Sequence, residues 1–505
     1  MRTDLVADSD LVARRRSAFV SLRGALTPQN LEDVHRCAVK LYATLPHRDR
    51  LEKNVVLVAY GGGKDSSYTL AFVRAMQLRL FEVYGTTFSM RVVTNRHAGM
   101  PSAVMENIDR AYRALNLTID PDCVLLIVDG NEVRTFNVSL PQQDHVIQRN
   151  RLDILMTGHR TFADARPTFC NACNLSMVNS FGLAAAIDGG VDFVITGDSQ
   201  REQRAYYLWV NKLVGKFCQE SSGQQGGFRG FLAAVDAIAQ SYFTDIHGAQ
   251  DTAVIVERRL AADVSPMIRF FSIYDETSYS SSDHWELLTN YLGFKFDNLA
   301  FSFTESDCGN PALMAHLRGL KAERLFSRDY RDGQREYVNF ALSLMRKKEF
   351  PDSLIEIMRE RYSDDEALNW MRKQASEYAA EAYGLTEEQL ISMVYSPFAG
   401  RGRGLALYLA REQPELEALA DEMHAVLGSE DDCVLPSLVK ALERMSGLEL
   451  RQLRVLYRSE LRKRSAEVGG EDLLGAILDG DPHKSVIRTQ HAPDGPVVLE
   501  LLSGR

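Results

Sequence analysis

Residues 55–67 read VVLVAYGGGKDSS, and this stretch decides the fold. Its first six residues form a short apolar run that is typical of a buried strand, and a helical period follows over residues 66–80. Glycines between a strand and a helix let the backbone approach a phosphate closely, where the first N–H groups of the helix donate to the anion. We therefore predict a phosphate-binding loop at Gly61, Gly62 and Gly63.

The polar residues after the glycines fit the same prediction. Lys64 would add a positive charge beside the phosphates, and Ser66 and Ser67 would donate hydrogen bonds from their hydroxyl groups. Asp65 would act through Mg²⁺ or cap the helix. The spacing differs from G-x-x-x-x-G-K-[ST] and from G-x-G-x-x-G, which argues against a P-loop NTPase and against a Rossmann dinucleotide site.

Three further apolar runs predict strands: MRVVT (90–94), CVLLIV (123–128) and VDFVIT (191–196). Because helical patterns separate these runs, we predict an α/β fold with a doubly wound parallel sheet. Ligands of such sheets bind at the carboxyl ends of the strands, where the glycine loop and the pair Gly197-Asp198 both fall. The glycine loop and the Gly197-Asp198 pair are therefore predicted to line the same ligand-binding crevice.

The composition limits the classes of protein that this chain can represent. With 505 residues, 45% hydrophobic and 25% charged, it can bury a large core and form two or three packed units. A formal charge of -10 argues against a wide basic surface for nucleic acid. No stretch approaches ~18 uncharged apolar residues, so we expect a cytoplasmic protein without a membrane partner. The seven scattered cysteines argue against a disulfide framework.

The pattern divides the chain into three regions. Residues 1–50 are predicted to be a helical N-terminal segment, and residues 51–345 contain the predicted strands of a catalytic domain. Residues 346–505 are predicted to be amphipathic helices without strands, forming either a cap over the active site or an interface between copies of the chain. The Gly-, Gln- and Ser-rich stretch 219–230 is predicted to be a loop, either a lid or a plain connector.

A C-x-x-C pair, Cys170 and Cys173, stands at the start of a predicted helix. This spacing lets two thiolates converge on one metal ion, and a helix N-terminus lowers thiol pKa values, which suits redox or sulfur-transfer chemistry. Structural cysteines can have the same spacing, so the pattern leaves these roles open. Four other cysteines lack neighbours with ligand spacing and are predicted to be small core residues: Cys37, Cys123, Cys218 and Cys433.

The segment GGGKDS (61–66) resembles the S-G-G-x-D-S signature of the PP-loop ATP pyrophosphatases, an adenine nucleotide alpha hydrolase-like superfamily with a HUP-like fold. Gly61 stands where that family usually has Ser, which removes one hydroxyl donor but keeps the backbone cradle. The resemblance implies an enzyme that binds ATP and Mg²⁺, holds the pyrophosphate in this loop and forms an adenylated intermediate, releasing AMP. It covers residues 55–320 and is specific at the loop and at the cysteine pair.

The segment from Cys170 to VDFVITGDS (191–199) resembles the matching part of the two-thiouridine and two-thiocytidine tRNA sulfurtransferases. In that family a third cysteine lies downstream, and Cys308 is the candidate in this chain. The resemblance implies an Fe–S cluster of the 4Fe–4S type on three thiolates, or Zn²⁺ with a fourth ligand such as Asp307 or His284.

The N-acetyl-sugar amidotransferases are comparably similar, because they share the G-G-K-D-S loop, a C-x-x-C and a strand ending near G-E-S or G-D-S. The ending Thr196-Gly197-Asp198-Ser199 fits this pattern better than the T-G-H-N ending of the tRNA thiolases. The chain also lacks the extra cysteine and histidine pairs that many thiolases carry as an N-terminal zinc finger. The resemblance therefore makes tRNA the weaker candidate substrate.

Together these patterns predict a transferase or ligase that adenylates a small-molecule or carrier-bound substrate and installs sulfur or nitrogen from a donor protein. Lys64 would neutralise phosphate charge, and Asp65 would hold Mg²⁺ or cap the helix. Asp198 would contact metal or substrate, with an N-cap role equally open. Two alternatives stay open: a tRNA thiolation sulfurtransferase whose C-terminal helices read the RNA, and a non-catalytic nucleotide-binding protein.

Overall fold

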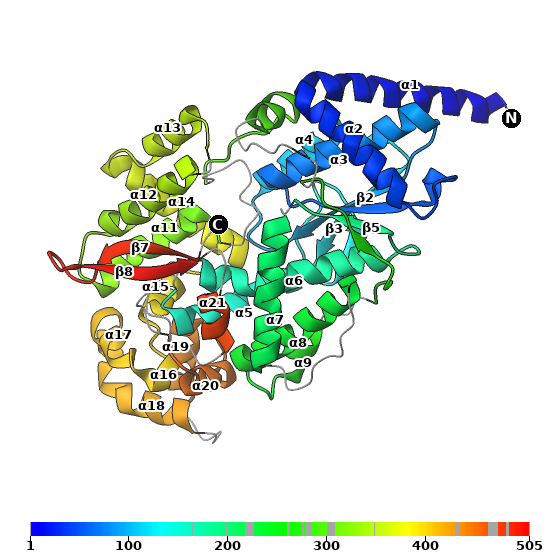
Figure 1. Ribbon diagram of the computed structural model, residues 1–505. Coiled ribbons are helices and arrows are strands. Elements are labelled where there is room, and N and C mark those ends of the chain that lie inside the picture. The colour runs from blue at the N-terminus through cyan, green and yellow to red at the C-terminus, as the bar shows by residue number, and fades with distance from the viewer. Residues whose placement is uncertain are drawn as a thin grey trace.

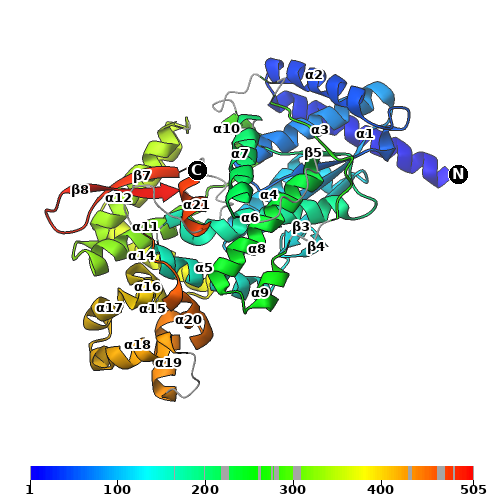
Figure 2. The ribbon, with the colours of Figure 1, turned by 60° about the horizontal axis from the view of Figure 1, so that its bottom comes forward.

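The computed structural model shows a sheet flanked by helices, joined to a second, mainly helical region (Figures 1 and 2). Both views place the elements up to residue 257 on one side of the molecule and most of those after residue 311 on the other. The structure describes the following residues: 2–163, 165–197, 200–217, 227–259, 263–274, 277, 284–299, 309–347, 349–429, 435–462, 473–480 and 484–503.

Six strands form the main sheet, in the order β4-β3-β2-β1-β5-β6. All neighbouring strands pair in parallel except β4, which runs antiparallel to β3. Since β1 pairs with β2 on one side and with β5 on the other, the strand order reverses at β1. The predicted α/β class is therefore confirmed. The strands are β1 Val55–Ala59, β2 Ser89–Arg96, β3 Cys123–Asp129, β4 Glu132–Thr135, β5 Phe193–Ile195 and β6 Arg269–Phe270.

One face of the sheet packs against helices from the beginning of the chain. Val56 and Val58 of β1 share a buried cluster with Phe72 and Ile108, which lie on the two helices that follow β1 and β2. The two N-terminal helices pack against the first of these, so the helical pattern of residues 1–50 is present in the structure. The helices on this face are α1 Arg2–Ala25, α2 Pro28–Thr44, α3 Lys64–Tyr84 and α4 Ser102–Ala114.

The opposite face of the sheet is covered by later helices. Leu57 and Val93 pack with Ala184 and Leu232 in a second buried cluster. Successive residues of a strand point to opposite faces of the sheet, so Leu57 points to this face while Val56 and Val58 point to the other. Both faces of β1 are therefore buried. Arg91 of β2 donates to the Ala184 carbonyl at 2.8 Å and so fixes one helix end on the sheet. The helices that follow β4 and β5 are α5 Asp144–Thr161, α6 Ala165–Ala186, α7 Gln200–Phe217, α8 Gly227–His247 and α9 Thr252–Glu257.

Most of the remaining helices form the second region, but the π-helical turn after α10 packs against α1 and α3, and α21 packs against α7 and α8. One buried cluster contains Leu70 of α3 together with Leu390 and Leu453 of this region, so the two regions share a continuous core. Two π-helical turns, Leu287–Tyr291 and Lys321–Leu325, extend the helices before them. The helices are α10 His284–Glu286, α11 Pro311–Leu320, α12 Tyr330–Lys347, α13 Asp352–Arg361, α14 Asp365–Tyr383, α15 Glu387–Tyr395, α16 Ala399–Gly402, α17 Leu405–Glu412, α18 Ala420–Gly428, α19 Pro436–Ser446, α20 Leu450–Arg458 and α21 Leu473–Gly480.

A β-hairpin near the C-terminus corrects the prediction that residues 346–505 contain no strands. Strands β7 Lys484–Gln490 and β8 Val497–Ser503 pair antiparallel. Ile487 and Leu502 are buried while Val486 is exposed, so the pattern alternates as a half-buried strand requires. Charged residues also anchor the hairpin, because Glu500 is fully buried and accepts a hydrogen bond from Arg318 of α11.

The predicted loop at 219–230 is wrong in its last part. Helix α8 begins at Gly227, so residues 227–230 are helical, while residues 219–226 lie outside the described residues. The glycines that favoured a loop are tolerated because Phe228 and Leu232 are buried against the sheet, and this packing outweighs the low helix propensity of glycine. Among the described helices, none is both long and apolar enough to span a membrane.

Candidate functional site

The glycine loop lies at the carboxyl end of β1, where the strand order reverses. Helix α3 begins at Lys64, and its N-cap residue is Gly63, which has no side chain to close the helix end. The first N–H groups of a helix have no acceptor within the helix, and the helix dipole favours an anion at this end. Open parallel sheets bind their ligands at such a point. The position of the loop therefore suits an anionic ligand.

Two glycines are placed where a side chain would not fit. Gly62 has a φ of 78°, and a Cβ on it would lie 3.0 Å from Cγ1 of Ile108 on α4. Gly197 directly follows β5, and a Cβ on it would lie 3.1 Å from both N and Cα of Ser66. The loop is thus packed between α4 and the end of β5. The structure brings Gly197 to the loop, as the strand pattern predicts.

The polar side chains of the loop differ in their exposure. Nζ of Lys64 lies 3.5 Å from Oδ1 of Asp65 and 5.5 Å from the centre of the Trp285 ring. The Lys64 side chain is 13% exposed, whereas that of Asp65 is 53% exposed. Ser66 donates to the Gly63 carbonyl at 3.0 Å, and its side chain is half-buried. Lys64 and Asp65 therefore present a sheltered ammonium group and an open carboxylate at the start of α3.

Ser67 and Tyr60 form a buried layer beneath the loop. Ser67 donates to the Gly63 carbonyl at 2.7 Å, and its hydroxyl lies 3.3 Å from that of Tyr60. Tyr60 also donates its N–H to Val93 at 2.9 Å and accepts from Thr94 Oγ1 at 2.8 Å. Burial raises the pKa of Tyr60 well above its ordinary value, so the phenol stays neutral. These contacts fix the backbone from which the loop departs.

The second region reaches the same edge of the sheet. Tyr378 of α14 donates a hydrogen bond to the carbonyl of Gly99, which lies in the loop after β2. A Cβ on Gly99 would overlap the hydroxyl group of Tyr383, the last residue of α14. Because β2 is the neighbour of β1, α14 holds a loop that is adjacent to the glycine loop.

The cysteine pair lies within α6. Cys170 and Cys173 are the sixth and ninth residues of this 22-residue helix, so they lie beyond its first turn and not at its start, where the sequence pattern predicts them. Within the described ranges, no group of three or more His, Cys, Asp or Glu residues is arranged to hold a metal. Six predicted site or ligand residues have side chains outside the description: Cys170, Cys173, Asp198, His284, Asp307 and Cys308.

No known family model, curated protein or solved structure matches this chain. What is established is the α/β architecture, with a mostly parallel sheet of six strands. The family assignment is an inference from the residues of the glycine loop and from their place in the sheet.

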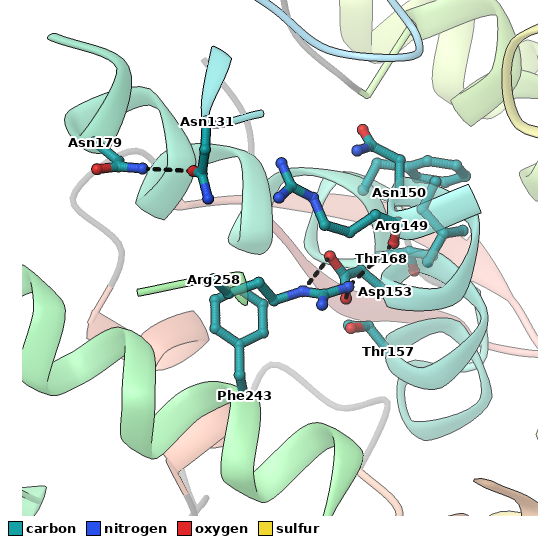
Figure 3. Close-up of a pocket in the computed structure, with 11 residues that line it drawn as sticks. Asn131, Arg149, Asn150, Asp153, Thr157, Thr168, Asn179, Phe243 and Arg258 are labelled. Carbon is teal, nitrogen blue, oxygen red and sulfur yellow. Dashed lines mark hydrogen bonds and ion pairs between the residues drawn. The ribbon is translucent and has the colours of Figure 1, made fainter. Parts of the chain in front are cut away.

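A polar pocket beside the end of β3 is a second candidate site, which the sequence did not indicate (Figure 3). Its walls come from the β3–β4 turn, from α5, α6 and α8, and from the residue that ends α9. The empty volume is about 610 Å³, including the part that opens to solvent. Thr168 and Phe169 line it, and these residues directly precede Cys170 on α6. The pocket therefore adjoins the cysteine helix.

An ion pair forms one wall of this pocket. Arg258 Nη2 donates to Asp153 Oδ1 at 2.8 Å, and Nε2 of His247 lies 2.8 Å from the same oxygen. Burial alone would raise the pKa of Asp153, but Arg258 and His247 outweigh it and hold this pKa below its ordinary value. Arg258 also lies 5.2 Å from the centre of the Phe243 ring. The carboxylate of Asp153 is thus already neutralised by its neighbours.

Proposed function

We propose that this protein is an AMP-forming enzyme of the PP-loop ATP pyrophosphatase class, with the doubly wound, HUP-like fold of that class. It adenylates an oxygen of its acceptor and then transfers sulfur or nitrogen to the activated atom. The observation that carries the proposal is the contact between Gly197 and Ser66, which places the end of β5 against the first turn of α3. This contact supports a narrow, backbone-lined anion site at the reversal point of the sheet.

The residues of the loop fit the phosphates of ATP. The backbone N–H groups at the start of α3 would bind the β- and γ-phosphates, and the sheltered ammonium group of Lys64 would neutralise their charge. The exposed carboxylate of Asp65 would hold Mg²⁺, which supplies positive charge to the departing pyrophosphate when it is bound. Asp198 would contact the metal or the acceptor.

The reaction has two displacements. A carbonyl or carboxylate oxygen of the acceptor attacks the α-phosphorus, an O–P bond forms, and the bond to the bridging oxygen of the β-phosphate breaks, releasing pyrophosphate. A sulfur or nitrogen nucleophile then attacks the activated carbon, and AMP leaves with the original oxygen. The protein contributes positioning and charge stabilisation rather than a covalent intermediate of its own.

The cysteine pair is proposed to serve the second displacement. Cys170 and Cys173, with Cys308 as third ligand, would hold a 4Fe–4S cluster or Zn²⁺. When bound, such a group supplies an open coordination position for a sulfur donor, or a structural centre if the donor is ammonia. The spacing on α6 supports the first two ligands, and the rest of the set is inferred from the resemblance.

Product analysis tests this function. The full-length protein, purified anaerobically, is incubated with ATP labelled at the α-phosphate, with sulfide or ammonium as donor, and separately with small-molecule and tRNA fractions as acceptors. AMP and pyrophosphate in equal amounts are expected, with the small-molecule fraction as the effective acceptor. ADP and orthophosphate would contradict the proposal, and turnover that depends on tRNA would favour the thiolation alternative. Lys64→Ala serves as the inactive control.

A further inference from the structure

Arg149 of α5 is an uncompensated positive charge in the pocket beside β3. Its guanidinium group forms no hydrogen bond or ion pair with any residue in the described part of the chain. It lies against the β3–β4 turn, because a Cβ on Gly130 would be 2.7 Å from Nη2 of Arg149. Figure 3 shows the side chain extending across the pocket toward Asn131. The Arg149 residue is half-buried, and its guanidinium group keeps its charge, so it favours an anionic partner.

The charged groups around Arg149 do not supply that partner. Asp153 is paired with Arg258 and lies 2.8 Å from His247. The side chain of Glu257 is 56% exposed, and its nearest cation is Arg258 at 3.9 Å. Burial lowers the pKa of Arg149, the charge of Arg258 lowers it further, and the two carboxylates offset only part of this. The pocket therefore has room for one more negative charge.

A buried amide in the same pocket also lacks a partner. Asn179 of α6 is 4% exposed, and its Nδ2 donates to Oδ1 of Asn131 at 2.9 Å. The Oδ1 atom of Asn179 is buried and has no hydrogen-bond partner among the described residues. Buried polar atoms are normally satisfied, so this oxygen indicates a missing donor. In Figure 3 this oxygen points away from Asn131 and Arg149, so it lies apart from the anion site that Arg149 offers.

The pocket and the glycine loop share one edge of the sheet. Strands β1, β2 and β3 are parallel neighbours, so their carboxyl ends lie at the same edge. The register places Asp129, the last residue of β3, two strands away from β1 and three residues beyond the level of Ala59, which is roughly 14 Å from the end of β1. The β3–β4 turn beside Arg149 follows the first of these ends, and the glycine loop follows the other. One small molecule can therefore have an anionic group at Arg149 and a reactive group near the α-phosphate of a bound nucleotide.

We propose that Arg149 binds a carboxylate or phosphate group of the acceptor substrate and thereby positions the acceptor along the sheet edge for adenylation. This inference rests on the proposed function and adds the substrate class, an acceptor that carries a carboxylate or phosphate group. Arg149 is a binding residue in this role.

The test uses malonate and inorganic phosphate as separate probes, with full-length protein and isothermal titration. The variants are Arg149→Gln, Arg149→Lys and Gly197→Ala, and the control is Arg113→Gln, an arginine that is 69% exposed on α4. At least one probe is expected to bind the wild type and to bind Arg149→Gln about tenfold or more weakly, with Arg149→Lys between them. Arg113→Gln should keep this binding. Phosphate binding is also measured with Gly197→Ala protein, so that a contribution from the glycine loop is excluded.

A structural role for Arg149 predicts a different result. Since the guanidinium has no partner, Arg149→Gln should melt at the same temperature as the wild type or higher when no anion is present. A lower melting temperature with unchanged probe binding would overturn the proposal, as would a wild type that binds neither probe. ATP binding is measured in parallel. If malonate binding depends on Arg149 while the wild type binds no ATP, the proposed function fails and the anion site stands.

Discussion

The backbone of Gly197 lies directly against the backbone of Ser66, and a Cβ at position 197 would stand 3.1 Å from the Ser66 nitrogen. The two residues belong to segments that meet only because β5 pairs with β1. A Cβ distance of 3.1 Å is tighter than nine in ten real Cβ contacts, and the opposing atoms are backbone, which cannot rotate away. The absence of a side chain at Gly197 therefore lets the end of β5 approach the first turn of α3 closely, which keeps the loop narrow.

The first prediction concerns Gly197→Ala. Because the new methyl group must displace the backbone at Ser66, ATP binding should weaken about tenfold or more, with only a modest loss of stability. Calorimetric titration with ATP and thermal unfolding measure the two effects. Gly215→Ala on α7 is the matched control, since its Cβ would meet nothing within 4 Å. Unchanged ATP affinity in Gly197→Ala would remove the main support for the loop assignment.

The second prediction concerns the charged residues of the loop. Lys64→Ala or Asp65→Ala should lower AMP formation by about 10²-fold or more, because each removes a charge that acts on the phosphates or on Mg²⁺. Both side chains are partly exposed at a helix end, so the fold should remain intact. Release of labelled AMP is the measurement, and Lys53→Ala, at an exposed position before β1, is the control. Normal turnover in either variant would refute the assigned roles.

The third prediction concerns the cysteine pair. Anaerobic purification should give a brown protein with iron and sulfide, and the colour should disappear in Cys170→Ala. Cys37→Ala is the control, because Cys37 is buried on α2 and its Sγ donates to the carbonyl of Ile273 at 3.7 Å. Metal and sulfide analysis of each preparation gives the readout. A colourless wild type with stoichiometric zinc would exclude the cluster and favour the amidotransferase interpretation.

The fourth prediction concerns stability at low pH. His159 on α5 and His316 on α11 are buried, and burial lowers the pKa of each to about 3 from its ordinary value of 6.5. Below pH 6.5 the unfolded chain binds protons at both residues while the folded protein does not. The free energy of unfolding is therefore unaffected by these groups above pH 6.5. It should fall by about 1.4 kcal/mol per pH unit for each histidine between pH 6.5 and 3.

Urea denaturation between pH 8 and pH 4.5 measures this slope. His159→Leu should reduce the slope of unfolding free energy against pH by the contribution of one histidine, because leucine fills a similar volume without a titrating group. His35→Gln is the control, since His35 is an exposed histidine on α2. A wild-type stability that is constant across this range would show that the two histidines are not kept neutral by burial.

The strands near the glycine loop could be predicted because each is a short apolar run. Strands β4 and β6 have no such run, and they form by pairing with β3 and β5, which a sequence does not display. The C-terminal hairpin was missed because its apolar and polar residues alternate weakly, and Glu500 occupies a buried position. Its one local signal is the turn at Asp494 and Gly495, where Asp494 has a φ of 55°.

The candidate site likewise contains one feature with a local sequence signal and one that depends on the packing of distant segments. The glycine loop is a local pattern, so its residues and its place after β1 follow from the sequence. The pocket beside β3 is not local, because Arg258 at the end of α9 and Asn179 of α6 reach it through tertiary packing. Arg149 and Asp153 are four residues apart on α5, but no spacing in the sequence relates them to the other two residues. Such a site becomes visible only when the tertiary structure is known.

The hydrogen bond from Tyr378 to Gly99 has a practical consequence for expression of the protein. A recombinant fragment that stops near residue 345 would keep every strand of the main sheet but lose the helix that anchors the loop after β2. It would also uncover the apolar side chains that join Leu70 to Leu390 and Leu453 in one core. Enzymology on such a trimmed polypeptide would therefore report on a damaged binding edge, and the intact chain is the appropriate reagent.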